Sequence, residues 1–204
     1  MNNNIKIVMW DYGGVLTESP IKNFTKFENK FNYTSNTIIK INSHNKLDNA
    51  WAKFEKNIIS LKEFSILFKK EAKVFGIDNI DAYELLKCLD VKLNIKMIEL
   101  LQKVSKNYIS ICLTNNFKYI SSNSFKNIKK YFDHIFESSE LAMRKPEKKI
   151  YNYVLKNLNA NAEEILFIDD LGINLKPARL LGFHTYKFVD TKTTIDFVKN
   201  LLKI

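Results

Sequence analysis

Short runs of apolar residues recur along the chain, and the three clearest runs end on polar residues. They are 5–10 (IKIVMW), followed by Asp11 and a glycine pair, 108–113 (YISICL), followed by Thr114-Asn115-Asn116, and 165–168 (ILFI), followed by Asp169-Asp170. Runs of this length that are bounded by turn residues are typical of strands buried on both faces of a parallel sheet. We expect two weaker strands at 134–137 and 185–189.

Helical patterns lie between these runs. Pro146 and Glu147 open one helix, and its apolar residues recur on one face, namely Ile150, Tyr151, Val154, Leu155 and Leu158. A second helix is expected over 174–181, with Pro177 acceptable only in its first turn and Gly182 as its stop. Strands that alternate with helices predict an α/β fold, with a doubly wound, mostly parallel, Rossmann-like sheet covered by helices on both faces.

The region from 18 to 98 has a different pattern. It lacks alternating strands, and its apolar residues recur at helical spacing, as in Ala50, Trp51, Phe54, Ile58, Leu61, Phe64, Leu67 and Phe68. We therefore expect a small helical cap at 18–98, inserted after the first strand of a core domain formed by 1–17 and 99–204. Such a cap would sit above the ends of the strands.

Polar residues at strand ends are the candidates for chemistry, because the carboxyl ends of parallel strands meet at one edge of a sheet. Asp169 and Asp170 are adjacent carboxylates, and their repulsion costs stability unless a cation offsets it. A hard cation such as Mg²⁺ prefers carboxylate and carbonyl oxygens. Asp11 and Asp170, facing each other across the strand ends, would supply that environment.

Two further segments add anion-binding groups. Thr114 and Asn115 offer a hydroxyl and backbone amides at the same edge, although an ordinary helix N-cap would use the same residues. Lys145 precedes Pro146 at a helix start, where unpaired backbone amides already favour anions. A lysine at this end of a helix is unfavourable unless a negative charge lies nearby.

The ordered set of motifs resembles the haloacid dehalogenase (HAD) superfamily. The motifs are Asp11-x-Gly13-Gly14-Val15-Leu16, then Leu113-Thr114-Asn115, then Arg144-Lys145-Pro146-Glu147-x-x-Ile150-Tyr151, and then Phe167-Ile168-Asp169-Asp170-x-Gly172-x-Asn174. The last two are particularly similar to the amino-terminal phosphatase domain of soluble epoxide hydrolases. They also resemble a related domain of some acyl-CoA dehydrogenase fusion proteins.

The resemblance implies a Mg²⁺-dependent phosphomonoester hydrolase that acts through an aspartyl-phosphate on a small phosphorylated metabolite. In such an enzyme Asp11 would be the nucleophile. The other implied roles are metal binding by Asp11, the Gly13 carbonyl and Asp170, support of the metal by Asp169, phosphate binding by Thr114 and Asn115, charge balance by Lys145, and anchoring of the metal loop by Asn174. A dehalogenase of the same superfamily is the alternative. Dehalogenases generally work without magnesium and carry a different fourth motif, and the Asp169-Asp170 pair favours phosphate chemistry.

The sequence departs from the phosphatase pattern at one position. Phosphatases of this superfamily usually carry an acid/base aspartate two residues after the nucleophile, where this chain has Gly13. General acid–base catalysis is worth about 10²–10⁴ in rate. A water or a cap residue, with Glu18, His44 and Glu55 as candidates, would have to replace it. Otherwise turnover is slow or specialised, or the protein is a weakly active domain that binds a phosphate ligand.

Charge and composition limit the binding partners and the cellular location that we expect. The net charge is +10, but nearly all of the basic residues are lysines, and Arg144 and Arg179 are the only arginines. Readers of nucleic acids use more arginine, so we expect no nucleic-acid function. Cys88 and Cys112 fit small buried hydrophobes better than a disulfide or metal site. No membrane-spanning run or signal peptide is evident, which predicts a cytoplasmic protein; oligomeric state is left open.

Overall fold

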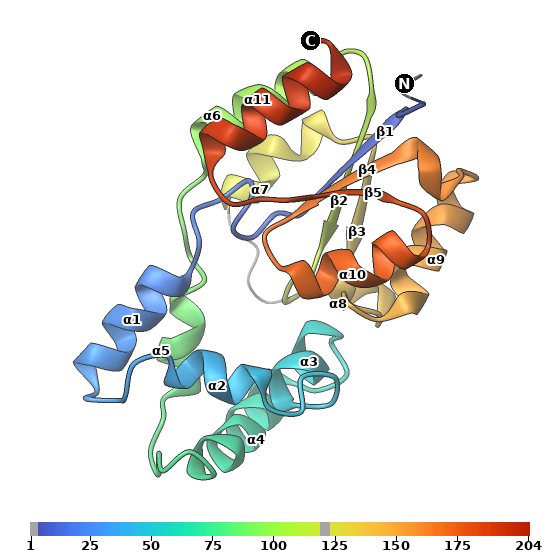
Figure 1. Ribbon diagram of the computed structural model, residues 1–204. Coiled ribbons are helices and arrows are strands. Elements are labelled where there is room, and N and C mark those ends of the chain that lie inside the picture. Colours follow the sequence, from blue (N-terminus) through green and yellow to red (C-terminus); the bar gives the residue numbers. More distant parts are fainter. Residues whose placement is uncertain (1–3, 119–122) are drawn as a thin grey trace.

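Five parallel strands form one sheet in the order β3-β2-β1-β4-β5 (Figure 1). The structure is a computed structural model that describes residues 4–118 and 123–204. The first three residues of the predicted core segment lie outside the described residues. The strands are β1 (Ile7–Trp10), β2 (Ile109–Thr114), β3 (His134–Glu137), β4 (Ile165–Asp169) and β5 (His184–Lys187). The predicted α/β fold with a parallel sheet is confirmed.

Alternate side chains of the central strands enter two separate hydrophobic clusters, because successive residues of a strand point to opposite faces. Val8 and Trp10 belong to one cluster, and Ile7 and Met9 belong to the other. The first face is covered by α6 (Ile95–Val104), α7 (Asn123–Ile128) and α11 (Thr191–Leu202), and the second by α8 (Ser138–Leu141), α9 (Lys148–Leu158) and α10 (Gly172–Leu180). Two 3₁₀ turns, Lys129–Tyr131 and Ala162–Glu164, precede β3 and β4.

Helix α10 starts earlier than the sequence pattern predicts. It spans Gly172–Leu180 rather than 174–181, so Pro177 lies beyond the first turn. The start is set by Leu171, whose carbonyl accepts hydrogen bonds from the N–H groups of Asn174 (2.9 Å) and Leu175 (3.4 Å). The predicted position of Pro177 in the first turn is therefore wrong, and the helix accepts a proline that cannot donate the usual backbone hydrogen bond.

The segment between β1 and α6 forms a helical unit, which we call the cap. Its helices are α1 (Ile21–Lys30), α2 (Thr37–Ser43), α3 (Ala50–Glu55), α4 (Leu61–Lys73) and α5 (Ala82–Lys87). Their apolar faces enclose a third cluster that is rich in aromatic rings and is separate from the two clusters of the sheet. Phe117, from the loop after β2, is the member of this cluster that the core supplies.

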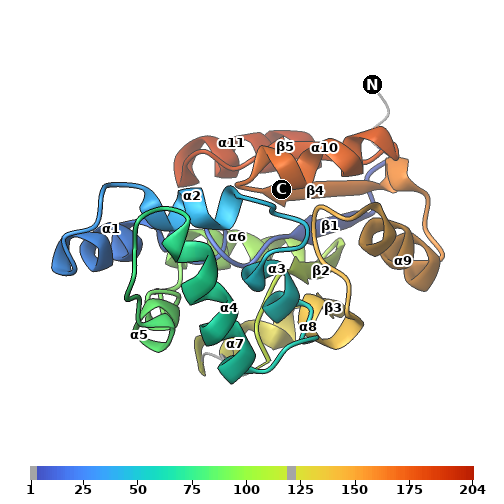
Figure 2. The same ribbon diagram turned by 90° about the horizontal axis from the view of Figure 1, so that it is seen from below.

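The cap lies over the carboxyl ends of the strands, as Figures 1 and 2 show from two directions. Its two chain connections run side by side, because Thr17 and Leu93 form an antiparallel bridge. The predicted second boundary of the cap, after residue 98, falls inside α6, whose apolar residues pack on the sheet. Across residues 4–118 and 123–204, no helix has the length and apolar character needed to cross a membrane.

Candidate active site

Three carboxylates meet where β1 and β4 end. Asp11 and Asp169 are buried and Asp170 is partly buried, and one ligand oxygen from each lies within 4.8 Å of the others. The sheet register explains the meeting, because Trp10 pairs with Ile168 and the next residues, Asp11 and Asp169, leave adjacent strands at the same level. The sequence-based expectation that these side chains converge agrees with the geometry.

Lys145 lies between two of these carboxylates. Its Nζ is 2.8 Å from Oδ1 of Asp11 and 2.7 Å from Oδ2 of Asp169, and its side chain is only 1% exposed. A buried ammonium is tolerated only when charged partners replace its water, and both partners are present. Asn115 fixes the backbone of Lys145 in both directions, accepting a hydrogen bond from its N–H (2.9 Å) and donating one to its carbonyl (3.0 Å).

The electrostatics of the cluster are dominated by burial. Burial raises the pKa of Asp11 well above its ordinary value in spite of Lys145 beside it, and burial with the nearby Asp169 raises the pKa of Asp170 to about 6. Burial alone would lower the pKa of Lys145, but Asp11 and Asp169 outweigh it and raise that pKa. Three carboxylates around one ammonium leave excess negative charge, which a divalent cation would offset.

Asp169 and Asp170 have different surroundings although they are adjacent. Asp169 accepts hydrogen bonds from the Asn174 amide at 3.0 and 3.1 Å and from the Leu171 N–H at 2.8 Å, in addition to its Lys145 contact. Oδ1 of Asp170 is buried and has no hydrogen-bond partner among the described residues. A buried carboxylate oxygen without a partner is costly unless an ion or water completes it, so this residue fits a cation ligand. Asn174 is itself held through its carbonyl by the Tyr151 hydroxyl at 2.7 Å.

The glycine pair after Asp11 has two distinct requirements. Gly14 has φ +78°, and a Cβ added there would lie 2.5 Å from Oδ2 of Asp170, so only glycine lets the β1 loop approach this carboxylate. Gly13 is exposed, and a Cβ added there would meet nothing within 4 Å. Its place in the predicted ligand set depends on its backbone carbonyl, and the space above it is open.

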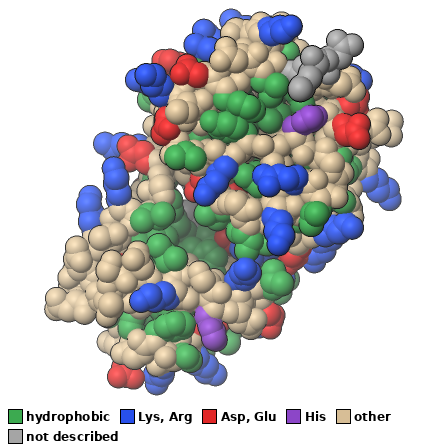
Figure 3. Space-filling model, viewed as in Figure 1, with side chains coloured by type: hydrophobic (Ala, Val, Ile, Leu, Met, Phe, Trp, Pro, Cys, Tyr) green, Lys and Arg blue, Asp and Glu red, His purple; other side chains and the backbone are tan. Residues whose placement is uncertain are grey.

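Thr114 is buried at the end of β2, beside β1 and therefore at the same edge as Asp11. Its hydroxyl makes a contact of 3.5 Å with the carbonyl of Asn115, which is too long for a strong hydrogen bond. Figure 3 shows the hollow between cap and core, lined by hydrophobic side chains, with basic side chains along its core-side rim. The strand ends that carry the site point toward the cap (Figure 1).

The three candidates for a substitute acid/base occupy different places. Glu18 is exposed at the connection to the cap, where its N–H donates to the carbonyl of Lys92. His44 packs edge-on against Phe75 within the cap. Glu55 is buried and forms an ion pair with Arg144, a partner that its sequence spacing could not reveal.

Comparison with a family model matches residues 5–182 to the haloacid dehalogenase-like hydrolases. The chain belongs to this family, as its motifs predict. It is 31% identical to Acyl-CoA dehydrogenase family member 10 of Mus musculus, across 97% of this chain and 19% of that protein. It is 34% identical to Bifunctional epoxide hydrolase 2 of Rattus norvegicus, across 50% of this chain and 20% of that protein. The chain thus spans about a fifth of the length of these relatives.

Among solved structures, the chain resembles a HAD family enzyme from Bacteroides thetaiotaomicron in complex with magnesium and inorganic phosphate. The TM-score is 0.63 at 26% identity, and the match covers 90% of this chain and 93% of that one. The fold and the acidic cluster at the strand ends therefore identify a HAD-family hydrolase whose acidic cluster could hold a metal.

Proposed function

We propose that the protein is a Mg²⁺-dependent phosphomonoester hydrolase that acts through an aspartyl-phosphate on Asp11. The observation that carries the proposal is the cluster of Asp11, Asp169 and Asp170 around one buried lysine, with an unpartnered oxygen on Asp170. The complex of the Bacteroides enzyme with magnesium and inorganic phosphate supports Mg²⁺ and a phosphate group as what this site binds. Asp11, the Gly13 carbonyl and Asp170 are the proposed metal ligands. When bound, Mg²⁺ would offset charge on the phosphoryl oxygens.

In the first step a carboxylate oxygen of Asp11 attacks phosphorus, the bond to the ester oxygen breaks, and an acyl phosphate forms. Lys145 neutralises Asp11 and holds it in place, while Thr114 and the Asn115 amide bind phosphoryl oxygens. Because Gly13 carries no carboxyl group, the leaving alkoxide takes its proton from water. In the second step water attacks phosphorus, which releases inorganic phosphate and restores Asp11.

A small phosphorylated metabolite with an apolar part is the substrate class we favour. The hydrophobic lining of the hollow and the basic side chains at its rim support this choice (Figure 3). An excess of positive charge at a cleft raises the local concentration of anionic substrates. A panel of phosphorylated metabolites, assayed for phosphate release, would identify the preferred leaving group.

The test is phosphate release from p-nitrophenyl phosphate, with Mg²⁺ and with EDTA. We expect activity only with Mg²⁺, and a loss of at least about 10³-fold in Asp11→Asn because the nucleophile is gone. Asp196→Asn, at an exposed position of α11, is the matched control and keeps full activity. Phosphate release that persists in Asp11→Asn contradicts the proposal. Halide release from 2-chloropropionate without Mg²⁺ would indicate the dehalogenase alternative.

The absence of a carboxyl group at position 13 favours a second candidate, a domain that binds a phosphate ligand with little turnover. The two are separated by measuring binding and release on the same sample. Tight binding of orthovanadate in the presence of Mg²⁺, with no phosphate release from the metabolite panel, would support the binding domain. Release from even one metabolite at Mg²⁺-dependent rates would exclude it.

A further inference from the structure

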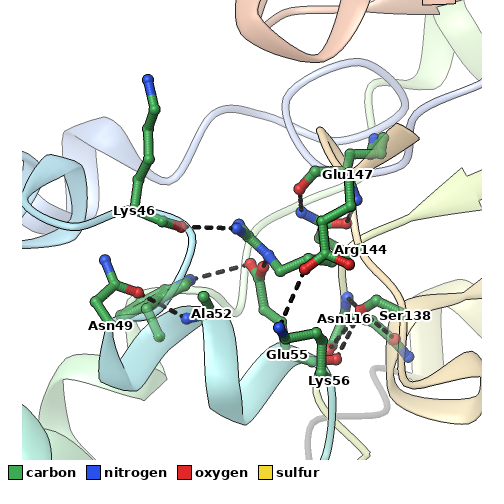
Figure 4. Close-up of polar contacts among 12 residues, drawn as sticks. Lys46, Asn49, Ala52, Glu55, Lys56, Asn116, Ser138, Arg144 and Glu147 are labelled. Atoms are coloured by element: carbon green, nitrogen blue, oxygen red, sulfur yellow. Dashed lines mark hydrogen bonds and ion pairs between the residues drawn. The ribbon is translucent and has the colours of Figure 1, made fainter. Parts of the chain in front are cut away.

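A group of polar contacts joins the end of α3 in the cap to the core (Figure 4). Oε2 of Glu55 lies 2.5 Å from Nε of Arg144, and its Oε1 accepts a hydrogen bond of 3.1 Å from the indole N–H of Trp51. Both members of the ion pair are largely buried, with side chains 8% and 13% exposed. Because both oxygens of Glu55 are engaged, this residue is unsuited to act as the missing acid.

The core partners of Glu55 are Arg144 and Ser138, and each connects it to a segment that carries proposed phosphate-binding groups. Arg144 directly precedes Lys145, the buried lysine of the site. The carbonyl of Glu55 accepts a hydrogen bond of 2.8 Å from the Ser138 hydroxyl. That hydroxyl in turn accepts one of 2.9 Å from the N–H of Asn116, the residue after Asn115. The end of α3 is thus attached to the loop that follows β2 and to the segment that carries Lys145.

These contacts lie away from the two chain connections of the cap. The connections meet at the bridge between Thr17 and Leu93, whereas α3 packs against α8 at the other side of the strand ends (Figure 1). Rotation of the cap about its connections would therefore pull Glu55 away from Arg144. Such a separation would leave a charged group on each side without its buried partner, so the closed arrangement is favoured when both are present.

We infer that Glu55 is a positioning residue, which holds Arg144 and through it Lys145, so that closure of the cap and placement of the Lys145 charge occur together. The inference rests on the proposed phosphatase function. The ion pair with Arg144 joins the end of α3 directly to the segment that carries Lys145, and Ser138 links it indirectly to the loop after β2. Both links connect the cap to the groups that bind phosphate. A small displacement of such groups is enough to lower the rate, because orientation contributes strongly to catalysis.

The adjacent residue supplies a matched control. Nζ of Lys56 lies 3.0 Å from Oε1 of Glu147, so this pair also joins the end of α3 to the core. Glu147 has a second cation, Lys149, at 3.1 Å, and it follows Lys145 by two residues instead of adjoining it. Loss of Lys56 leaves Glu147 paired and the Arg144 contact intact. Lys56→Gln therefore reports on loss of a cap–core ion pair in general.

The test compares kcat and KM of Glu55→Gln, Arg144→Gln, the double variant and Lys56→Gln with p-nitrophenyl phosphate. We expect kcat to fall about tenfold in Glu55→Gln and at least as much in Arg144→Gln, which also loses its hydrogen bond to the carbonyl of Lys46. The double variant loses no more than Arg144→Gln, because both changes remove the same ion pair. Lys56→Gln stays within about twofold of the unchanged protein. Equal kcat in Glu55→Gln and Lys56→Gln, or additive losses in the double variant, would overturn the inference.

Chemical rescue separates positioning from a general loss of stability. Guanidinium ion at low concentration, added to Arg144→Ala, is expected to restore stability by occupying the place beside Glu55, but it does not restore kcat because a free ion is not joined to Lys145. The same addition to the Glu55→Gln/Arg144→Ala variant restores nothing, since the buried carboxylate is absent. Recovery of kcat in Arg144→Ala would mean that the ion pair acts without the link to Lys145, and that result would count against the inference.

Failure of the proposed function gives a different result from failure of this inference. If the unchanged protein releases no phosphate, the phosphatase proposal fails, and hydrogen–deuterium exchange of residues 138–146 then decides on positioning. Faster exchange in Glu55→Gln, but not in Lys56→Gln, retains Glu55 as the residue that fixes this segment. Equal exchange in the two variants rejects that role.

Discussion

Charged side chains are packed together in the core at the ends of β1 and β4, whereas the interior of the cap is built from aromatic rings. In the core, Lys145 and two aspartates lie within hydrogen-bond distance and far from solvent. In the cap, the ring centroids of Phe54 and Phe64 are 4.7 Å apart, and those of Phe64 and Phe68 are 5.4 Å apart. At its strand ends the core buries charge by pairing it, whereas the aromatic cluster of the cap buries apolar area.

This difference separates what each region contributes. The contacts of Lys145, Asp169 and Asn174 with one another lie wholly within the core, so the site geometry is fixed there by directional bonds. The aromatic cluster reaches the core through Phe117 and through the indole N–H of Trp51, which donates to Glu55. Its effect on the site passes through these contacts. Changes in the core are expected to alter chemistry, and changes inside the cap are expected to alter stability.

The largest effect is expected for Lys145→Met. Removing the ammonium leaves Asp11 and Asp169 buried without their cation, which costs about 3–5 kcal/mol of stability. It also removes the charge that stabilises the transition state, so kcat falls by at least about 10²–10³. Urea unfolding and phosphate release measure the two effects. Lys149→Met, at a half-exposed lysine of α9, is the control and leaves both unchanged.

A kcat within tenfold of the unchanged protein in Lys145→Met would break the comparison. It would mean that pairing with this lysine is not what fixes the chemistry of the core. The unfolding data guard against a trivial loss, because activity is expressed per folded molecule.

The next effect is Phe64→Ala in the cap. This side chain is fully buried between two other phenylalanines, and its truncation leaves a cavity that costs about 3–5 kcal/mol. The free energy of unfolding, from urea denaturation, is the measurement. Ile66→Ala on the same helix removes a half-exposed side chain and costs less than about 1 kcal/mol. Equal losses for the two would show that the aromatic cluster does not carry the stability of the cap.

Gly14→Ala tests the core at a smaller scale. The added methyl group would lie 2.5 Å from Oδ2 of Asp170, at a backbone φ of +78°. We expect about 1–3 kcal/mol of destabilisation and a rise of about tenfold in the Mg²⁺ concentration that gives half-maximal activity, because Asp170 must move. Magnesium titration of the activity checks this. Gly13→Ala, where the methyl group meets no atom within 4 Å, leaves the titration unchanged.

Much of this arrangement follows from the sequence, because parallel topology turns strand ends into a site. The polar residues after three apolar runs predict one edge, and the register brings Asp11 and Asp169 to it. The different surroundings of Asp169 and Asp170 could not be predicted, since alternation along a strand does not say which carboxylate finds a partner.

Contacts between the cap and the core cannot be predicted from the pattern of apolar and polar residues. Glu55 and Arg144 are 89 residues apart and lie on different units. No period or spacing relates them, and each is an ordinary charged residue in the printed sequence. The early start of α10 could not be predicted for a related reason. It depends on which carbonyl accepts the hydrogen bond from the N–H of Asn174.

The smallest effect is expected for Gly13→Asp, and it asks whether core or cap limits the reaction. Position 13 is exposed with open space above it, so a carboxyl group fits without displacing Asp11. It would protonate the leaving oxygen, and we expect a gain of about tenfold or less in kcat for alkyl phosphates, below the usual value of an evolved acid. Aryl phosphates, whose leaving groups need little protonation, change by less than about twofold.

The contrast between the two leaving groups is the measurement, made as kcat on an alkyl and an aryl phosphate with Gly13→Asn as the control that adds bulk without an acid. A gain confined to the alkyl ester and to aspartate places the deficit in the core, at position 13. No gain for either substrate would mean that proton delivery does not limit the rate. Opening of the cap about the Thr17–Leu93 bridge would then be the step to measure, and Glu55→Gln would be expected to change it.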